Sequence, residues 1–125
     1  MEPANDQGII NANEYDLAAS SQAFVEAIDA LARRTKSEGH PGVEAYRWFF
    51  DDDAGTAGAI IVYKNAAAWV GHHELAYKWD EMAALQATVS LRRLTLFGPL
   101  SNDLTTWLSN ANLSYIHYPT WAAGF

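Results

Sequence analysis

The histidines are the side chains of this sequence best suited to moving a proton near neutral pH. Two of the four are adjacent, His72 and His73, in a segment whose apolar residues recur at helical spacing. A partly buried imidazole can hold its pKa near the working pH and act as a general base, and we place this role on His72. A hydrogen bond from the same ring to the backbone at a helix bend is the alternative. His73 points roughly 100° away around the helix, so we expect it to face solvent.

Metal and nucleotide cofactors are not indicated by the sequence. Neighbouring helical side chains do not converge on one ion, no His-x-x-x-His spacing occurs, and His40 and His117 lie in unrelated segments. There is no cysteine, which excludes disulfides, thiolate catalysis and Cys-ligated zinc or iron–sulfur sites. The glycines never form the cluster that cradles a phosphate. We therefore expect neither a metal nor a nucleotide cofactor.

Aromatic side chains flank the histidine segment, in a chain with five Trp, six Tyr and five Phe. Small-molecule sites are typically apolar clefts with a few polar groups. We predict a pocket for a flat aromatic ligand, walled by Trp69, Tyr63, Trp79, Tyr46 and Trp48. For each of these residues taken singly, a place in the core or in a subunit interface is the favoured explanation.

An anion that develops in such a pocket needs polar partners. Asn65 and one arginine of the pair Arg92-Arg93 are our candidates, with Arg92 named for the pocket. Adjacent residues of a strand point to opposite faces, so we expect only one of the two arginines to face the ligand. The alternative is an ion pair across the sheet with Glu44 or an Asp.

The charge balance disfavours two classes of partner. Fifteen acidic and eight basic residues give a formal net charge of −7, which repels nucleic-acid phosphates and anionic membrane surfaces. No apolar run approaches the ~18–20 residues of a membrane span. The segment 1–6 is acidic and polar and lacks the parts of a signal peptide. We expect a cytoplasmic protein with no nucleic-acid or membrane partner.

The elements that position these residues follow from periodicity and turn signals. The first half of the chain predicts a strand over 8–17, a helix from Ser20-Ser21 to Gly39, and a hairpin of strands 43–50 and 56–64. The second half predicts a helix over 65–86 bent near Gly71-His72-His73, a strand over 89–97, a helix over 101–112 and an aromatic tail over 113–125. In the helix over 65–86, Trp69, His72 and Trp79 share one face.

This order of elements is βαββαβ followed by an appended helix and tail. It predicts an α+β ferredoxin-like domain, with one antiparallel four-stranded sheet and two helices on one face. No repeat or linker divides the chain. We expect a single domain over 1–125, with its core over about 8–100 and the addition over 101–125.

The predicted strands carry large apolar side chains on both faces, although two helices can cover only one. The run over 59–63, Ala-Ile-Ile-Val-Tyr, shows this most clearly. An uncovered second face would be a larger apolar patch than monomers usually tolerate. We therefore predict a homodimer packed sheet to sheet about a two-fold axis. Folding of the aromatic tail across that face is the alternative.

Two stretches resemble signatures of the antibiotic-biosynthesis monooxygenase family. The first runs from Ile61 to His72 (IVYKNAAAWVGH): an aromatic-bearing strand ends, an Ala-rich helix opens and a His follows about one turn on. The second, from Thr35 to Tyr46, is similar to the family's Thr, Glu-Pro-Gly, Tyr stretch, with a Gly-His pair inserted before Pro41. In element order the resemblance extends over roughly 15–100.

The resemblance implies a dimeric α+β barrel and a monooxygenase that works without a cofactor. The implied substrate is a small electron-rich aromatic, such as a quinol, an anthrone or a polyphenol, whose anion reacts with dioxygen itself. His72 matches the family's second-helix histidine and would take the proton. Trp69 and its aromatic neighbours would bind the ring, and Asn65 or an arginine would steady the anion.

Two other functions stay open, because this fold hosts proteins of several kinds. One is a dimeric binding or stress-associated protein whose pocket holds a small molecule without turnover. The other resembles haem-degrading relatives, which have Asn on the first strand, where Asn11 or Asn13 stands, a Trp in the second helix and a His about ten residues later. Here Trp79 occupies the position ten residues after Trp69.

Overall fold

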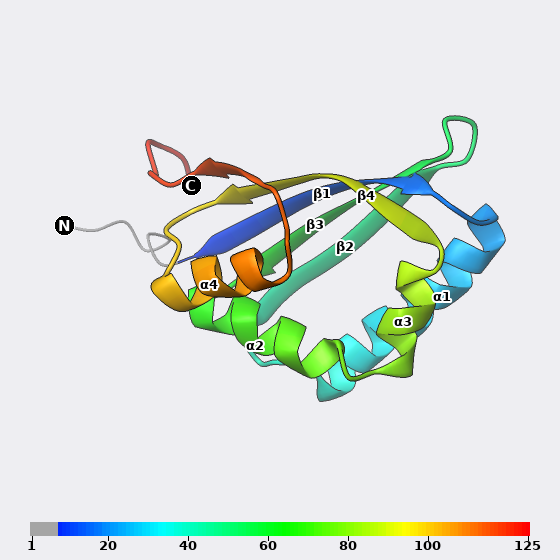
Figure 1. Cartoon of the computed structure of the whole chain (residues 1–125), viewed down its shortest axis with the longest axis horizontal. Coiled ribbons are helices and arrows are strands. Elements are labelled where there is room, and N and C mark those ends of the chain that lie inside the picture. The colour runs from blue at the N-terminus through cyan, green and yellow to red at the C-terminus, as the bar shows by residue number, and fades with distance from the viewer. Residues whose placement is uncertain (1–7) are drawn as a thin grey trace.

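The computed structural model describes residues 8–125, so the polar amino-terminal segment lies outside the described residues. Its elements are β1 (Ile9–Leu17), α1 (Ser21–Glu38), β2 (Val43–Asp51), β3 (Thr56–Tyr63), α2 (Ala66–Ala76), α3 (Asp80–Gln86), β4 (Val89–Phe97), α4 (Asn102–Asn110) and β5 (Ile116–Tyr118). One sheet runs through the molecule in the order β2-β3-β1-β4-β5 (Figure 1). Within the described part of the chain, no helix is both long enough and apolar enough to cross a membrane.

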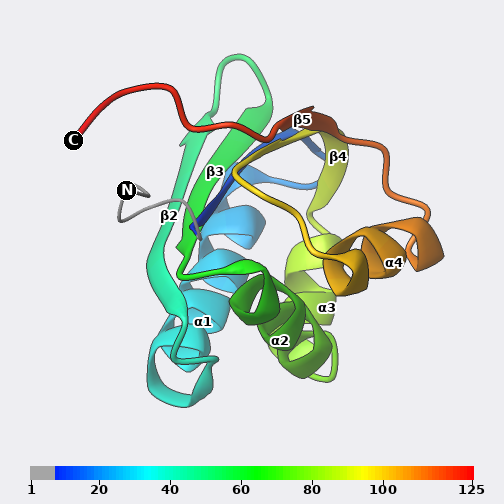
Figure 2. The same ribbon diagram turned by 90° about the vertical axis from the view of Figure 1, so that its left-hand side faces the viewer.

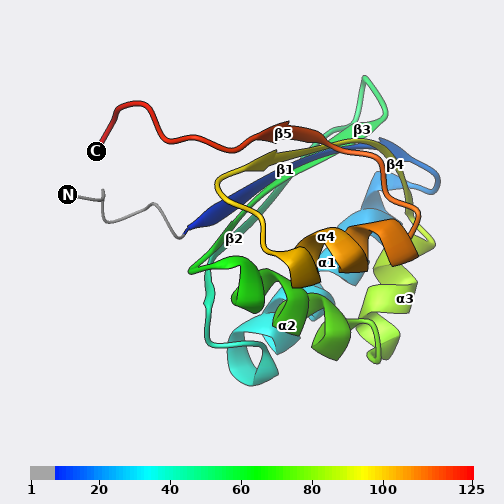
Figure 3. The same ribbon diagram turned by 60° about the vertical axis from the view of Figure 1, so that its left-hand side comes forward.

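The helices lie together on one face of the sheet, and the opposite face carries none of them (Figures 2 and 3). The pairs β2–β3, β3–β1 and β1–β4 are all antiparallel, in the arrangement expected of a ferredoxin-like core. The predicted α+β fold is confirmed. Strand β3 shows why the fold forms: Ala57, Ala59, Ile61 and Tyr63 alternate along it and are buried beneath the helices.

The prediction of a four-stranded, wholly antiparallel sheet is wrong at one edge. β5 lies within the stretch predicted as a tail and pairs parallel to β4. The backbone N–H of Gly98 donates to the Tyr118 carbonyl at 2.9 Å, and the His117 ring bonds the Gly98 carbonyl at 2.7 Å. A strand of three residues shows too little alternation to be predicted from its sequence.

The long second helix is interrupted later than predicted. α2 runs unbroken through Gly71-His72-His73, and the break falls at 77–79, where Trp79 has extended backbone (φ −94°, ψ 140°) and begins α3. Asp80 and Glu81 then occupy the first turn of α3, where their charge suits the helix dipole. The break separates Trp79 from the face that carries Trp69 and turns it toward α1, where the Arg34 guanidinium lies 4.7 Å from its ring centre.

Strand β4 contains an irregularity that changes the direction of its arginines. The register with β1 shifts between Glu14 and Tyr15, so that Glu14 pairs with Arg93 while Tyr15 pairs with Leu91. Arg92 is the extra residue of this bulge. It lies beside Asp16, and Arg93 lies beside Glu14, at 3.5 and 3.6 Å. The expectation that the two arginines point to opposite faces is therefore wrong, because both reach acidic side chains on the helix-free face.

The buried side chains form two clusters beneath the helices. One is built around Trp69, Tyr63 and the α4 leucines, and the other around Phe24, Leu31 and Trp79. Tyr15, Tyr46 and Trp48 contact both clusters. These three aromatic residues, on β1 and β2, therefore mark the junction at which the two halves of the core meet.

Candidate functional site

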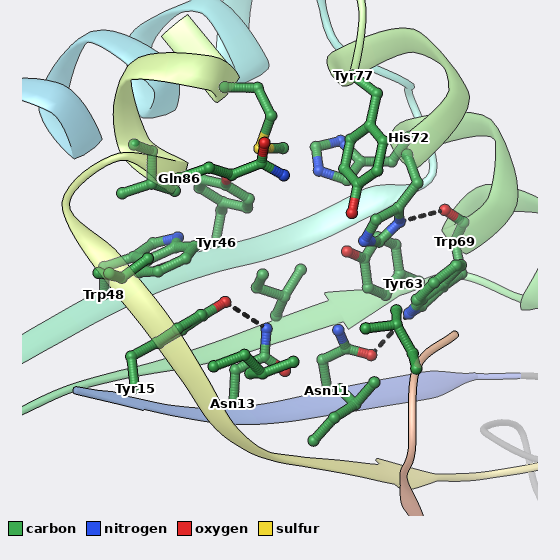
Figure 4. Close-up of a pocket in the computed structure, with 18 residues that line it drawn as sticks. Asn11, Asn13, Tyr15, Tyr46, Trp48, Tyr63, Trp69, His72, Tyr77 and Gln86 are labelled. Atoms are coloured by element: carbon green, nitrogen blue, oxygen red, sulfur yellow. Dashed lines mark hydrogen bonds between the residues drawn. The ribbon is translucent and has the colours of Figure 1, made fainter. Parts of the chain in front are cut away.

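A cavity of about 220 Å³ lies at this junction, between the sheet and the helices α2 and α3. It is predominantly aromatic and apolar, with a few amide and imidazole groups (Figure 4). Its lining residues are Asn11, Asn13, Tyr15, Tyr46, Trp48, Ile61, Tyr63, Trp69, His72, His73, Tyr77, Met82, Leu85, Gln86, Val89, Leu91, Leu94 and Leu113. This composition is typical of a site for a small, mostly apolar ligand.

A buried hydrogen bond joins the sheet to α2 at the wall of the cavity. The Trp69 indole Nε1–H donates to the Asn11 side-chain oxygen at 2.7 Å, and both residues are about 1% exposed. Asn65 caps α2, accepting from the Ala68 N–H at 2.8 Å, and so begins the turn that carries Trp69. Because the Asn11 oxygen is bonded to Trp69, its amide nitrogen lies on the cavity side, where its N–H groups can donate (Figure 4).

His73 stacks on Trp69, with ring centres 3.7 Å apart and planes inclined by 18°. Its Nδ1 lies 2.8 Å from the Trp69 carbonyl, which can only accept, so Nδ1 carries the proton and Nε2 is left as an acceptor. Burial, followed by the neighbouring His72, lowers the pKa of His73 to about 3. The expectation that His73 faces solvent is wrong, because the aromatic wall holds its ring.

His72 lies deeper, between two tyrosines. It is 2% exposed, and its ring centre lies 5.7 Å from that of Tyr46 and 5.9 Å from that of Tyr63. Burial, with a smaller contribution from His40, lowers the pKa of His72 to about 4. Both histidines are therefore neutral at pH 7, and each holds an added proton weakly unless a negative charge is nearby.

The tyrosines of the cavity are hydrogen-bond donors rather than bases. Burial raises the pKa of Tyr15 to about 12 and the pKa values of Tyr46 and Tyr63 further. Tyr15 stacks on Trp48 at 5.4 Å, and its hydroxyl oxygen accepts from the Asn13 amide at 2.8 Å. The hydroxyls keep their protons across the physiological pH range.

Buried polar atoms without a partner concentrate at this cavity. Among residues 8–125, six buried side-chain atoms have no hydrogen-bond partner, and four of them belong to residues that line it: Asn13 Oδ1, Trp48 Nε1, Tyr63 Oη and His72 Nδ1. Each such atom costs roughly 1–3 kcal/mol of stability when left unpaired. A polar ligand atom that reached one of these four atoms would therefore be stabilising.

The structure brings together five of the eight predicted site residues. Tyr46, Trp48, Tyr63, Trp69 and His72 line the cavity. Asn65 is a helix cap, Trp79 packs in the second core cluster, and Arg92 lies on the helix-free face beside Asp16. Arg92 fails to reach the cavity because of the bulge in β4, and Trp79 because of the helix break before α3.

Several lining residues were not predicted from the sequence, chiefly Tyr15, His73, Tyr77 and Gln86. Asn11 and Asn13 were considered only as counterparts of the first-strand Asn of haem-degrading proteins. A signal for the β1 group was available. Ile9, Asn11, Asn13 and Tyr15 occupy alternate positions, so the face that buries Ile9 also carries two amides and a hydroxyl. Polar residues on the inward face of a strand are costly in a plain core, which makes them pointers to a site.

Comparison with known proteins yields structural neighbours only. No protein-family model matches the sequence, and no curated protein matches it. SnoaB, a cofactor-independent oxygenase from Streptomyces nogalater, superposes with a TM-score of 0.59 at 15% identity, over 77% of this chain and 96% of SnoaB. A Caulobacter crescentus CB15 protein proposed to be an antibiotic-biosynthesis monooxygenase gives 0.56 at 20% identity, over 73% and 87% of the two chains. The chain has the antibiotic-biosynthesis monooxygenase-like fold.

The appended C-terminal segment of this monooxygenase-like fold also has a structural counterpart. MupZ from Pseudomonas fluorescens superposes with a TM-score of 0.77 at 14% identity, over 99% of this chain and 94% of MupZ. Coverage of 99% has to include α4 and β5, which the shorter matches to SnoaB and the Caulobacter protein do not require. The predicted resemblance is thus confirmed as a likeness of fold, and the C-terminal addition recurs in another protein.

The lowered pKa values of the histidines predict acid destabilisation. As the pH falls below 6.5, His72 is protonated in the unfolded chain but stays neutral in the folded chain. The free energy of unfolding therefore decreases as the pH falls, until the pH reaches the folded-state pKa of His72, about 4. Between pH 7 and pH 4, His72 alone should account for on the order of 2–3 kcal/mol. Urea unfolding of the wild type and of His72→Gln should show a shallower pH dependence in the variant. Equal slopes, or an NMR-titrated His72 pKa near 6.5, would contradict the assignment.

Proposed function

We propose that this chain is a cofactor-independent monooxygenase for a small, uncharged aromatic substrate such as a quinol, an anthrone or a polyphenol. The observation that carries the proposal is the aromatic cavity at which an oriented amide, Asn11, and two neutral histidines meet. The likeness of fold to SnoaB supports the same class of reaction. The chain would supply binding, proton transfer and exclusion of water, and the substrate would supply the electrons.

The reaction balances without a second reductant. A substrate carbon that bears two hydrogens, as in an anthrone, loses a proton to give an electron-rich anion. The anion passes electrons to dioxygen, a carbon–oxygen bond forms, and the resulting hydroperoxide breaks its O–O bond. One oxygen atom stays as a carbonyl, and the other leaves as water with the two hydrogens of the original carbon.

Each step has a candidate group in the cavity. The aromatic rings of Trp48 and Trp69 would flank the substrate, and the Asn11 N–H groups would donate to the oxygen on which negative charge develops. His72 would accept the proton, and the acceptor nitrogen of His73 is the second candidate. A pKa of about 4 for His72 suits this role only when the anion forms beside it, because the ion pair then stabilises the imidazolium.

The cavity wall also limits the charge of the substrate. Among residues 8–125, those that line the cavity include no Asp, Glu, Lys or Arg. A carboxylate or phosphate bound there would lose its water without gaining a cation, which costs several kcal/mol. We therefore propose that the substrate is neutral when it enters and becomes an anion only during the reaction.

Binding without turnover is the second candidate function. The observation that favours it is the low proton affinity of both histidines, since a general base works best with a pKa near the working pH. The haem alternative gains no ligand at position 79, because Trp79 packs beneath α1, away from the cavity.

Oxygen consumption tests the proposed function. With a panel of quinols, anthrones and polyphenols and no added cofactor, we expect protein-dependent oxygen uptake on at least one member. His72→Gln should slow it by roughly 100-fold or more, since a positioned base contributes ~10²–10⁴-fold. His117→Gln, a matched change outside the cavity, should leave it unchanged. Tight binding of a panel member with no oxygen uptake would favour the binding function instead.

We propose further that the chain forms a homodimer through the helix-free face of its sheet. That face presents a row of large exposed apolar side chains: Ile10, Phe49, Ile60, Phe97, Ile116 and Tyr118. Ion pairs of Glu14 with Arg93 and Asp16 with Arg92 lie on the same face. An identical surface related by a two-fold axis would cover the apolar row.

A charge placed at the centre of this face should separate the subunits. Ile60 is 43% exposed on β3, a strand paired on both sides within the sheet. Native mass spectrometry should give twice the monomer mass for the wild type and mostly monomer for Ile60→Lys. Val25→Lys is the control, because Val25 is 41% exposed but lies on α1. A monomeric wild type at micromolar concentration would contradict the proposal.

A further inference from the structure

The appended helix α4 packs against α2 next to the cavity. Leu104 and Leu108 anchor it, each fully buried in the first core cluster. Ser101 caps its start, accepting from the Leu104 N–H at 3.1 Å. Trp107 lies beside these anchors and is only half-buried. The docking of α4 therefore rests on the two leucines and the cap, which leaves the Trp107 ring available for another role.

Trp107 meets three aromatic rings of α2 and the turn that follows it. Its ring centre lies 5.0 Å from Trp69, 5.2 Å from His73 and 5.4 Å from Tyr77, and all three contacts are edge-to-face. Contacts of this geometry are each worth about 0.5–1.5 kcal/mol beyond burial. All three partners line the cavity, and Trp107 itself does not.

The position of Trp69 depends on contacts in three directions. Its indole nitrogen bonds Asn11, His73 stacks on its face, and Trp107 meets it edge-on. The hydrogen bond holds one edge of the indole, and the stacked imidazole is itself held by Trp107. Removal of Trp107 would expose His73 to water. It would also remove one of the contacts that hold the stacked Trp69 and His73 rings in place.

We infer that Trp107 is a positioning residue, which holds the Trp69–His73 pair in the orientation that the cavity requires. The expected effect on turnover rests on the proposed function. The expected effect on the position of Trp69 and His73 does not depend on it. It also gives the C-terminal addition a role, since α4 belongs to the part of the chain beyond the predicted core. The low pKa of His73 agrees with the burial that Trp107 helps to provide.

The test uses the full chain with Trp107→Ala, Trp107→Phe and, as a matched control on an exposed position of the same helix, Thr106→Ala. The structural readout is NMR: the pKa of His73, and hydrogen exchange of the Trp69 indole N–H. In Trp107→Ala we expect the His73 pKa to rise toward 6.5 and the indole proton to exchange at least ~10-fold faster. In Trp107→Phe both the His73 pKa and the indole exchange rate should be close to their wild-type values, and in Thr106→Ala they should equal them.

The kinetic readout applies once a substrate is found. Trp107→Ala should lower kcat by about 10- to 100-fold with little change in KM, since misplacement of a group acts on the reacting geometry. A wild-type His73 titration and indole exchange in a folded Trp107→Ala would overturn the inference. If no substrate is turned over, the proposed function fails while the NMR result still decides the role of Trp107.

Discussion

The hydrogen bond between Asn11 and Trp69 is the interaction on which the rest of the site depends. It spans 58 residues of sequence and joins the central strand β1 to the helix α2 in a place closed to water. A bond of this kind between buried groups is costly to break, because both partners would be left unsatisfied. It orients an amide toward the cavity and fixes the plane of the indole on which His73 stacks.

The surroundings of that bond explain why the cavity combines polar groups with a dry wall. The two core clusters meet at Tyr15, Tyr46 and Trp48 without filling the space between them. Burial keeps the tyrosines protonated and the histidines neutral, so the resting site is uncharged. An anion formed there would face only the imidazolium made by the same proton transfer, and every oriented dipole would act on it at low dielectric. The same absence of cations disfavours a substrate that arrives charged.

Most of the helices and strands could be predicted from residue patterns, and each difference between prediction and structure has a local physical cause. The alternation in β3 and the turn signals around it predict the hairpin closely, and the bounds 89–97 of β4 agree with the prediction. The bulge at Arg92 moves the inward positions of β4 from Leu91 to Leu94, a step of three residues. Strict alternation does not allow for such a step, so it gave the wrong direction for the arginines. The break at Trp79 is set by packing against α1 and Arg34, which is a tertiary contact. His73 faces inward because its ring stacks on the Trp69 indole and its Nδ1 hydrogen-bonds the Trp69 carbonyl.

The most direct test of the account is the response of the Trp69 indole N–H to ligands, followed by NMR on the wild-type protein. An uncharged quinol or anthrone is compared with its carboxylated counterpart. The account predicts a saturable shift of the Trp69 resonance with the uncharged compound, binding at least ~10-fold weaker for the carboxylate, and an unchanged indole of Trp121 in the exposed tail. Binding of either compound that leaves Trp69 unmoved, or equal affinity for the two, would contradict it.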